Sequence, residues 1–141
     1  MMRDEEGLIP LAGATDLYVA LNFGTLQGTR FVDLWRLAPL RRIVQRGGML
    51  SIGALATFSQ LLRSRAVRAR APALIEAARQ IGGVQIQNRG TIGGNIANGS
   101  PAGDSLPVLA VLEAVVVLRS ATCLKRNCKS SSSSVWWPQV A

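Results

Sequence analysis

The chain has 141 residues, 48% hydrophobic and 17% charged, with a formal net charge of +8 at pH 7. This length suffices for one compact domain with a core and not for two well-built ones. The absence of histidine excludes His-based catalytic triads, His-ligated metal sites and a histidine general base. The only cysteines, Cys123 and Cys128, match no common zinc or redox spacing, so we expect no metal site and no stabilising disulfide.

The positive charge comes from arginines that cluster at 41–46 and 63–70. Such clusters can neutralise phosphates, so a basic nucleic-acid-binding module is one interpretation. Aromatic residues for base stacking are scarce and do not alternate with the arginines. Solvated faces and docking surfaces for partner subunits are therefore the favoured interpretation, with no nucleic acid bound.

Hydropathy gives no indication of a membrane segment. No apolar run approaches the ~18 residues of a membrane span. The acidic start, residues 1–6, lacks the basic-then-apolar layout of a signal peptide. We therefore expect a cytoplasmic protein without a membrane span.

The first predicted element is a strand at 8–12 that Gly13 stops. Thr15 and Asp16 are good helix N-caps, and the apolar residues of 17–21 predict a short helix behind them. A strand that ends in a glycine turn and a helix start is a frequent place for an anionic ligand, because free backbone N–H groups and the helix dipole face it.

Four further elements are predicted in the middle of the chain: a strand at 31–34, a hairpin of 42–45 with 49–53, a helix capped by Thr57, and a helix from Pro72 to Ile81. The sequence Arg46-Gly47-Gly48 between the hairpin strands is typical of a tight turn. Gly82 and Gly83 end the last helix. We expect the apolar residues of both helices to form the core.

The segment 85–101 is rich in glycine and asparagine and carries one charge. It looks too polar and too flexible for a helix or a regular strand, so we predict a loop. Gly93 and Gly94 permit positive φ and a close approach of another group, successive N–H groups can form an anion-binding concavity, and Thr91 and Asn95 add side-chain donors. From the residues alone, a phosphate-bearing cofactor and an ordinary turn both remain open, since neither the dinucleotide fingerprint nor a P-loop is present.

After this segment, Asp104 or Ser105 is expected to cap a helix that runs through Leu112, and residues 114–118 read as a strand. Residues 1–120 contain thirteen arginines and no lysine, whereas 121–141 contain both lysines, both cysteines and an unbroken serine run. We therefore divide the chain into a domain at 1–120 and a low-complexity, disordered tail at 121–141. A frameshift near Ser120–Thr122 would explain the abrupt change, and a natural low-complexity tail is the alternative.

Two motifs resemble those of a known family, the FAD-binding domain of molybdopterin dehydrogenases, which includes the FAD subunits of xanthine dehydrogenase and aerobic carbon monoxide dehydrogenase. The first motif resembles the family's first flavin loop and consists of Leu11, Ala12, Gly13, Ala14, Thr15, Asp16 and Leu17. The second resembles its second flavin loop and consists of Thr91, Ile92, Gly93, Gly94 and Asn95. The continuation through Pro107 follows the same family, and the resemblance covers about residues 7–120.

The resemblance implies an α+β fold of the PCMH type (vanillyl-alcohol-oxidase-like) with FAD between two subdomains. It implies that residues 11–17 and 91–95 wrap the FAD diphosphate, where glycines let several N–H donors converge, and that Asp104 contacts the cofactor. The implied role is an electron-transfer subunit, an FAD-dependent oxidoreductase component, that takes electrons from iron–sulfur clusters and passes them to NAD or another acceptor. Its implied partners are a molybdenum-cofactor subunit and a [2Fe-2S] subunit. No catalytic acid, base or nucleophile is expected, because the flavin carries the redox chemistry.

The sequence departs from the family pattern in two places. Ala14 stands where many members have a second glycine, and alanine tolerates positive φ poorly, so we expect a negative φ there or a slightly altered turn. The later part of the family's FAD domain is missing after Ser120, so the 1–120 domain is expected to be incomplete at its C-terminal side. A nonfunctional, truncated or frameshifted product that cannot retain FAD is therefore an alternative to the electron-transfer subunit.

Overall fold

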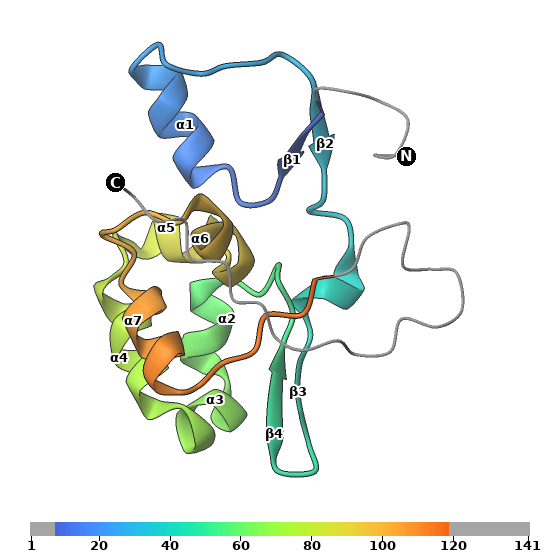
Figure 1. Cartoon of the computed structure of the whole chain (residues 1–141), viewed down its shortest axis with the longest axis vertical. Helices are drawn as coiled ribbons and strands as arrows, with labels where there is room; N and C mark the ends of the chain where they lie inside the picture. Colours follow the sequence, from blue (N-terminus) through green and yellow to red (C-terminus); the bar gives the residue numbers. More distant parts are fainter. Residues whose placement is uncertain (1–7, 119–141) are drawn as a thin grey trace.

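The computed structural model describes residues 8–118, and its N-terminal part is a small β–α–β unit (Figure 1). Strand β1 (Ile9–Leu11) and strand β2 (Phe31–Asp33) run parallel, with Ile9 opposite Phe31, and helix α1 (Thr15–Asn22) connects them. The predicted first strand, first helix and second strand are thus confirmed. Parallel pairing brings the carboxyl ends of both strands to one edge of the pair.

The predicted hairpin is also confirmed. A 3-10 turn, η1 (Ala38–Arg41), leads into β3 (Ile43–Arg46), which pairs antiparallel with β4 (Met49–Ile52). Gly47 and Gly48 both have positive φ, 53° and 80°, as a two-residue turn of type I′ requires. The turn therefore fixes the register, and its residues fit the conformation that it needs.

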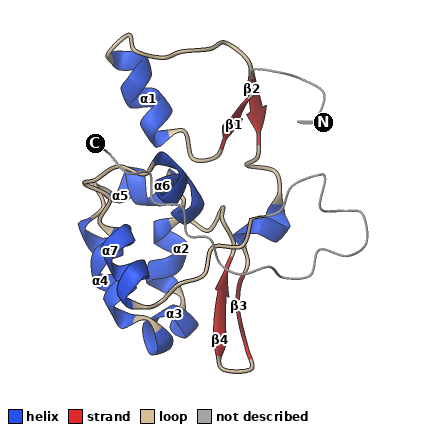
Figure 2. Cartoon of the chain, viewed as in Figure 1, coloured by secondary structure: helices blue, strands red, loops and turns tan. Residues whose placement is uncertain are grey.

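Three short helices follow and pack together beside the hairpin (Figure 2). Helix α2 (Phe58–Arg63) starts with a capping box, in which the Thr57 side chain accepts from the Gln60 amide and the Gln60 side chain accepts from the Thr57 amide. Helix α4 (Pro72–Gln80) begins at a proline, whose missing N–H has no intrahelical partner at that position anyway. Between them lies α3 (Arg65–Arg70), capped by Ser64, which the sequence analysis did not predict.

The expectation of a loop at 85–101 was wrong. Residues of this segment form α5 (Val84–Arg89) and α6 (Ile92–Asn98). Thr91 caps α6 by accepting from the Gly94 amide at 3.1 Å, and Gly99 ends it in the left-handed conformation. Low helix propensity is a weak preference that tertiary packing overrides, and here caps at both ends stabilise a helix of poor composition.

The last helix is α7 (Ser105–Val111), as expected, but the strand predicted at 114–118 is not formed. Its apolar side chains are exposed, Val115 by 74% and Leu118 by 86%, so β propensity finds no partner strand among residues 8–118. The tail at 121–141, with the proposed frameshift and both cysteines, lies outside the described residues.

The core lies among α2, α3, α4 and the start of α6, with the hairpin and α7 packed against it. Its fully buried members include Phe58, Leu61, Val67, Leu74 and Ala78. The apolar residues predicted as core in the two capped helices are thus largely confirmed. In the part of the chain at 8–118, no helix has the length and apolar character needed to cross a membrane.

Candidate cofactor site

The first glycine turn connects the carboxyl end of β1 to the amino end of α1. Ala14 is the residue before the helix and has φ 65° and ψ 11°, so the expectation of a negative φ was wrong. The alanine adopts the left-handed conformation that favours glycine. Thr15 and Asp16 do not cap: Thr15 is the first helical residue, and no side chain caps α1. The first amides of a helix have no intrahelical acceptor, so this end presents free N–H donors.

Gly13 is buried against the end of α5. A Cβ built on Gly13 would overlap the Arg89 carbonyl oxygen and lie 3.2 Å from the Gly90 Cα. Only a glycine permits this approach of two backbones. The first turn therefore lies directly against the residues that precede Thr91, which brings it close to the start of the second motif although about 75 residues separate the two motifs in sequence.

The second motif is anchored to the core through its own backbone. The Ile92 amide donates to the Ala56 carbonyl at 3.0 Å and the Gly93 amide to the Ala54 carbonyl at 2.9 Å. The Gly94 and Asn95 amides donate to the side chain and carbonyl of Thr91. These four donors are occupied, so this motif positions the site more than it supplies amides to it.

Gly93 and Gly94 have negative φ, and neither serves as a left-handed turn. A Cβ on Gly93 would lie 2.6 Å from the Ala54 carbonyl oxygen, and one on Gly94 would lie 2.9 Å from Thr91 Oγ1. Of the two uses that the sequence suggested, close approach is the one that the structure shows. The glycines let α6 start in contact with the chain at Ala54.

Asn95 lies within α6, and Asp104 directly precedes α7 at the end of the turn that connects the two helices. The side-chain oxygen Oδ1 of Asn95 accepts from the buried Ser105 hydroxyl, which leaves the side-chain nitrogen Nδ2 of Asn95 as a free donor. Asp104 is exposed, and its side chain does not cap α7. The capping role that the sequence offered for Asp104 is therefore not seen, and its carboxylate is available to a ligand.

The sequence analysis did not single out Arg89 and Gly90, although both stand directly before Thr91. Gly90 is buried and its carbonyl accepts from the Phe58 amide at 3.2 Å. The glycine in Arg89-Gly90-Thr91 was a usable indication, because a glycine immediately before a helix cap is typical of a close backbone contact. What could not be read from the sequence is that the contacting residue is Gly13.

Comparison with known proteins identifies the family of the chain. The family model described as the FAD binding domain in molybdopterin dehydrogenase matches residues 1–130. The chain belongs to this family. Similar relatives include the nicotinate dehydrogenase FAD-subunit of Eubacterium barkeri, 39% identical over 110 residues, which cover 78% of this chain and 37% of the relative. Another is the carbon monoxide dehydrogenase medium chain of Hydrogenophaga pseudoflava, 39% identical over 108 residues, 77% of this chain and 38% of the relative.

Solved structures of the same kind share the fold. A carbon monoxide dehydrogenase from Hydrogenophaga pseudoflava superposes with a TM-score of 0.67 and 37% identity, over 70% of this chain and 34% of that chain. Quinoline 2-oxidoreductase from Pseudomonas putida 86 gives 0.65 and 29%, over 69% of this chain and 34% of that chain. The α+β FAD-binding fold and FAD as the cofactor, both implied by the resemblance, are thus confirmed. The chain spans less than half of the length of these relatives.

Proposed function

We propose that this chain forms the diphosphate-holding front of an FAD-binding domain in the electron-transfer subunit of a molybdenum hydroxylase. The observation that carries the proposal is the contact of Gly13 with the Arg89–Gly90 peptide, which supports one shared site because this peptide directly precedes the second motif. In this site, the motif at 11–17 supplies free helix amides, and the motif at 91–95 supplies the side-chain NH₂ group of Asn95 and a rigid support. Asp104 is available to cofactor hydroxyls.

The available donors fit the charge of the cofactor. A dinucleotide diphosphate needs several converging donors, and hydrogen bonds to charged groups contribute about 1.5–3 kcal/mol each. The free first-turn amides of α1 lie at the positive end of an eight-residue helix, where an anion is favoured. The contact at Gly13 keeps these amides near the Arg89–Gly90 peptide, which directly precedes the second motif.

In the complete complex, FAD supplies the electron-carrying chemistry between iron–sulfur clusters and the final acceptor. Relatives are FAD subunits or medium chains of dehydrogenases, which supports a [2Fe-2S] subunit and a molybdenum-cofactor subunit as partners here. NAD is the acceptor that we propose, with another acceptor as the alternative, and the cytoplasm is the proposed location.

The test is a titration of the purified 141-residue chain with FAD, followed by gel filtration and the flavin absorbance of the protein peak. Co-elution of FAD with folded protein is the expected result. A chain that shows helical circular dichroism yet elutes without flavin would support the nonfunctional alternative instead. Salt-sensitive binding of DNA without flavin would point to the nucleic-acid-binding alternative.

Partner binding needs a separate experiment, because it does not follow from cofactor binding. The tagged chain is incubated with the iron–sulfur and molybdenum subunits of a related dehydrogenase from the same source and recovered on the tag. Retention of both subunits is expected. Docking also stabilises the chain by mass action, so FAD affinity is expected to rise in the complex, and an unchanged affinity would count against the proposed assembly.

A further inference from the structure

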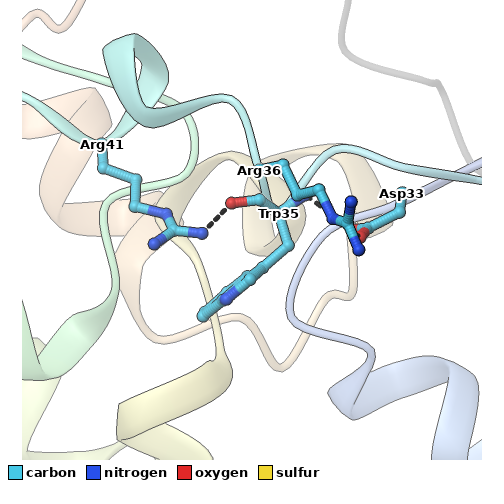
Figure 3. Close-up of polar contacts among 4 residues, drawn as sticks. All are labelled: Asp33, Trp35, Arg36 and Arg41. Carbon is cyan, nitrogen blue, oxygen red and sulfur yellow. Dashed lines mark hydrogen bonds and ion pairs between the residues drawn. The ribbon is translucent and has the colours of Figure 1, made fainter.

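Trp35 lies at the carboxyl edge of the β1–β2 pair, directly beside the first flavin motif. The Leu34 amide donates to the Leu11 carbonyl at 2.9 Å, which fastens the end of β2 to the end of β1. The Trp35 amide donates to the Asp33 carboxylate at 2.8 Å, and its carbonyl accepts from the Arg41 guanidinium (Figure 3). In open α/β sheets, ligands bind outside this edge of the strands.

Two guanidinium groups lie over the indole ring of Trp35. The central carbon of Arg41 is 4.2 Å from the ring centroid and that of Arg89 is 4.1 Å from it. Both distances are within the range of a cation–π contact. Segments from η1 and from the end of α5 therefore meet on one aromatic side chain.

This pair of cations has no acidic partner among residues 8–118. The carboxylate of Asp33 is already shared by the Trp35 amide and by Arg36, 3.8 Å away, and Glu76 is paired with Arg79. Two like charges that contact the same ring repel each other, less strongly the farther apart they lie. Bound anions at this edge would offset that repulsion.

The two arginines differ in what they can still bind. Arg41 holds Trp35 in place, because its guanidinium donates to the Trp35 carbonyl and lies over the indole ring. Its Nε is buried and has no partner. Arg89 is exposed, and its guanidinium makes the ring contact and no hydrogen bond within the described chain. Its donor fork is therefore free and is held in a fixed orientation by the ring.

Arg89 is also the residue whose carbonyl packs against Gly13. We propose that Arg89, held on the face of Trp35, is a further cofactor-contacting residue that donates to the diphosphate of FAD. Trp35 and Arg41 act as positioning residues for it. This inference rests on the proposed function and adds a charged, bidentate donor to a site that otherwise offers neutral amides.

The experiment measures FAD affinity of the full 141-residue chain by flavin fluorescence at low and at moderate salt, for four variants. Arg89→Gln removes the charge. Arg89→Lys keeps the charge without the planar set of donors, and Trp35→Phe weakens the cation–π contact that holds Arg89. Arg46→Gln is the matched control, because Arg46 is exposed at the end of β3 and loses the same charge. The melting temperature of each variant without FAD reports structural damage.

We expect Arg89→Gln to weaken FAD binding by about 10- to 100-fold at low salt, with a smaller loss at higher salt because an exposed charge is screened. Arg89→Lys should recover part of the affinity, and Trp35→Phe should weaken binding about threefold. Arg46→Gln should change affinity little.

The inference is overturned if Arg89→Gln binds FAD like Arg46→Gln, or if its loss of affinity is the same at every salt concentration and merely follows a lower melting temperature. Either result leaves the proposed function standing as long as the unsubstituted chain binds FAD. Failure of the unsubstituted, folded chain to bind FAD would overturn the proposed function and this inference together.

Discussion

The helical region and the N-terminal β1–α1–β2 unit are built on different principles. The helical region, 54–98, buries Phe58, Leu61 and Leu74 almost completely. Helix α1 has no buried residue; Tyr18 within it and Phe23 directly after it are exposed by 63% and 77%. The unit is fastened through backbone contacts, above all at Gly13, instead of through an apolar core. Binding elements are generally drawn from the less stable part of a fold, and this division places the first flavin motif there.

The largest effect is expected from one core leucine. Leu61→Ala should lower the free energy of unfolding by about 2–5 kcal/mol, because it removes buried methyl groups and leaves a cavity. Leu21→Ala is the matched control, since the same change is made on a side chain that is 54% exposed in α1, and it should cost well under 1 kcal/mol. Urea unfolding followed by circular dichroism measures both. Equal costs would contradict the comparison between the two regions.

A smaller and more local effect is expected at the contact between the regions. Gly13→Ala places a methyl group against the Arg89 carbonyl and should cost about 1–3 kcal/mol through overpacking. The first turn should separate from α5, so FAD affinity should fall and hydrogen exchange should quicken in 9–22 while 58–80 stays protected.

The control for this prediction is Gly83→Ala. Gly83 has a negative φ, and a Cβ there meets the end of a flexible Gln85 side chain at 3.2 Å. It should leave both FAD affinity and exchange in α1 nearly unchanged. If Gly13→Ala instead quickened exchange throughout α2 and α4, the two regions would form one cooperative unit and the contrast drawn above would be wrong.

The sequence predicted the elements with local signals better than those that depend on contacts between distant segments. Caps, proline starts and glycine turns are local, so Thr57, Pro72 and the Gly47-Gly48 turn located their elements correctly. Helix α6 was missed because its glycines and asparagines have low helix propensity. Besides its caps, it is held by non-local bonds, such as that of Gly93 to Ala54, which the sequence does not show. The cofactor contacts of the motifs at 11–17 and 91–95 stay predictions. The contact of Trp35 with Arg89 could not be predicted, because Arg89 is distant from Trp35 and Arg41 in sequence.

Loss of the capping box at α2 should have a moderate effect. Thr57→Ala removes the acceptor for the Gln60 amide and should lower the free energy of unfolding by about 1 kcal/mol. Thr57→Ser keeps the hydroxyl and should recover most of it. Thr57 also forms an isolated antiparallel β-bridge with Thr91. If Thr57→Ala lowers the free energy of unfolding by far more than about 2 kcal/mol, the bridge contributes more than the cap.

The smallest effect is expected at Ala14, and it should be a gain. Its φ of 65° costs an alanine roughly 1–2 kcal/mol relative to an unstrained backbone, whereas glycine adopts this conformation freely but loses more entropy on folding, by about 0.4–1 kcal/mol. Ala14→Gly should therefore raise the free energy of unfolding by up to about 1 kcal/mol. The same change inside α1, Ala20→Gly, should lower the free energy of unfolding by a similar amount.

Because α1 lies outside the buried core, the gain at Ala14→Gly should appear as slower hydrogen exchange in 9–22 and as tighter FAD binding, with little change in the exchange of α4. A loss of stability at Ala14→Gly would mean that the left-handed turn before α1 is not adopted, and the free helix amides assigned to the diphosphate would then have no fixed direction.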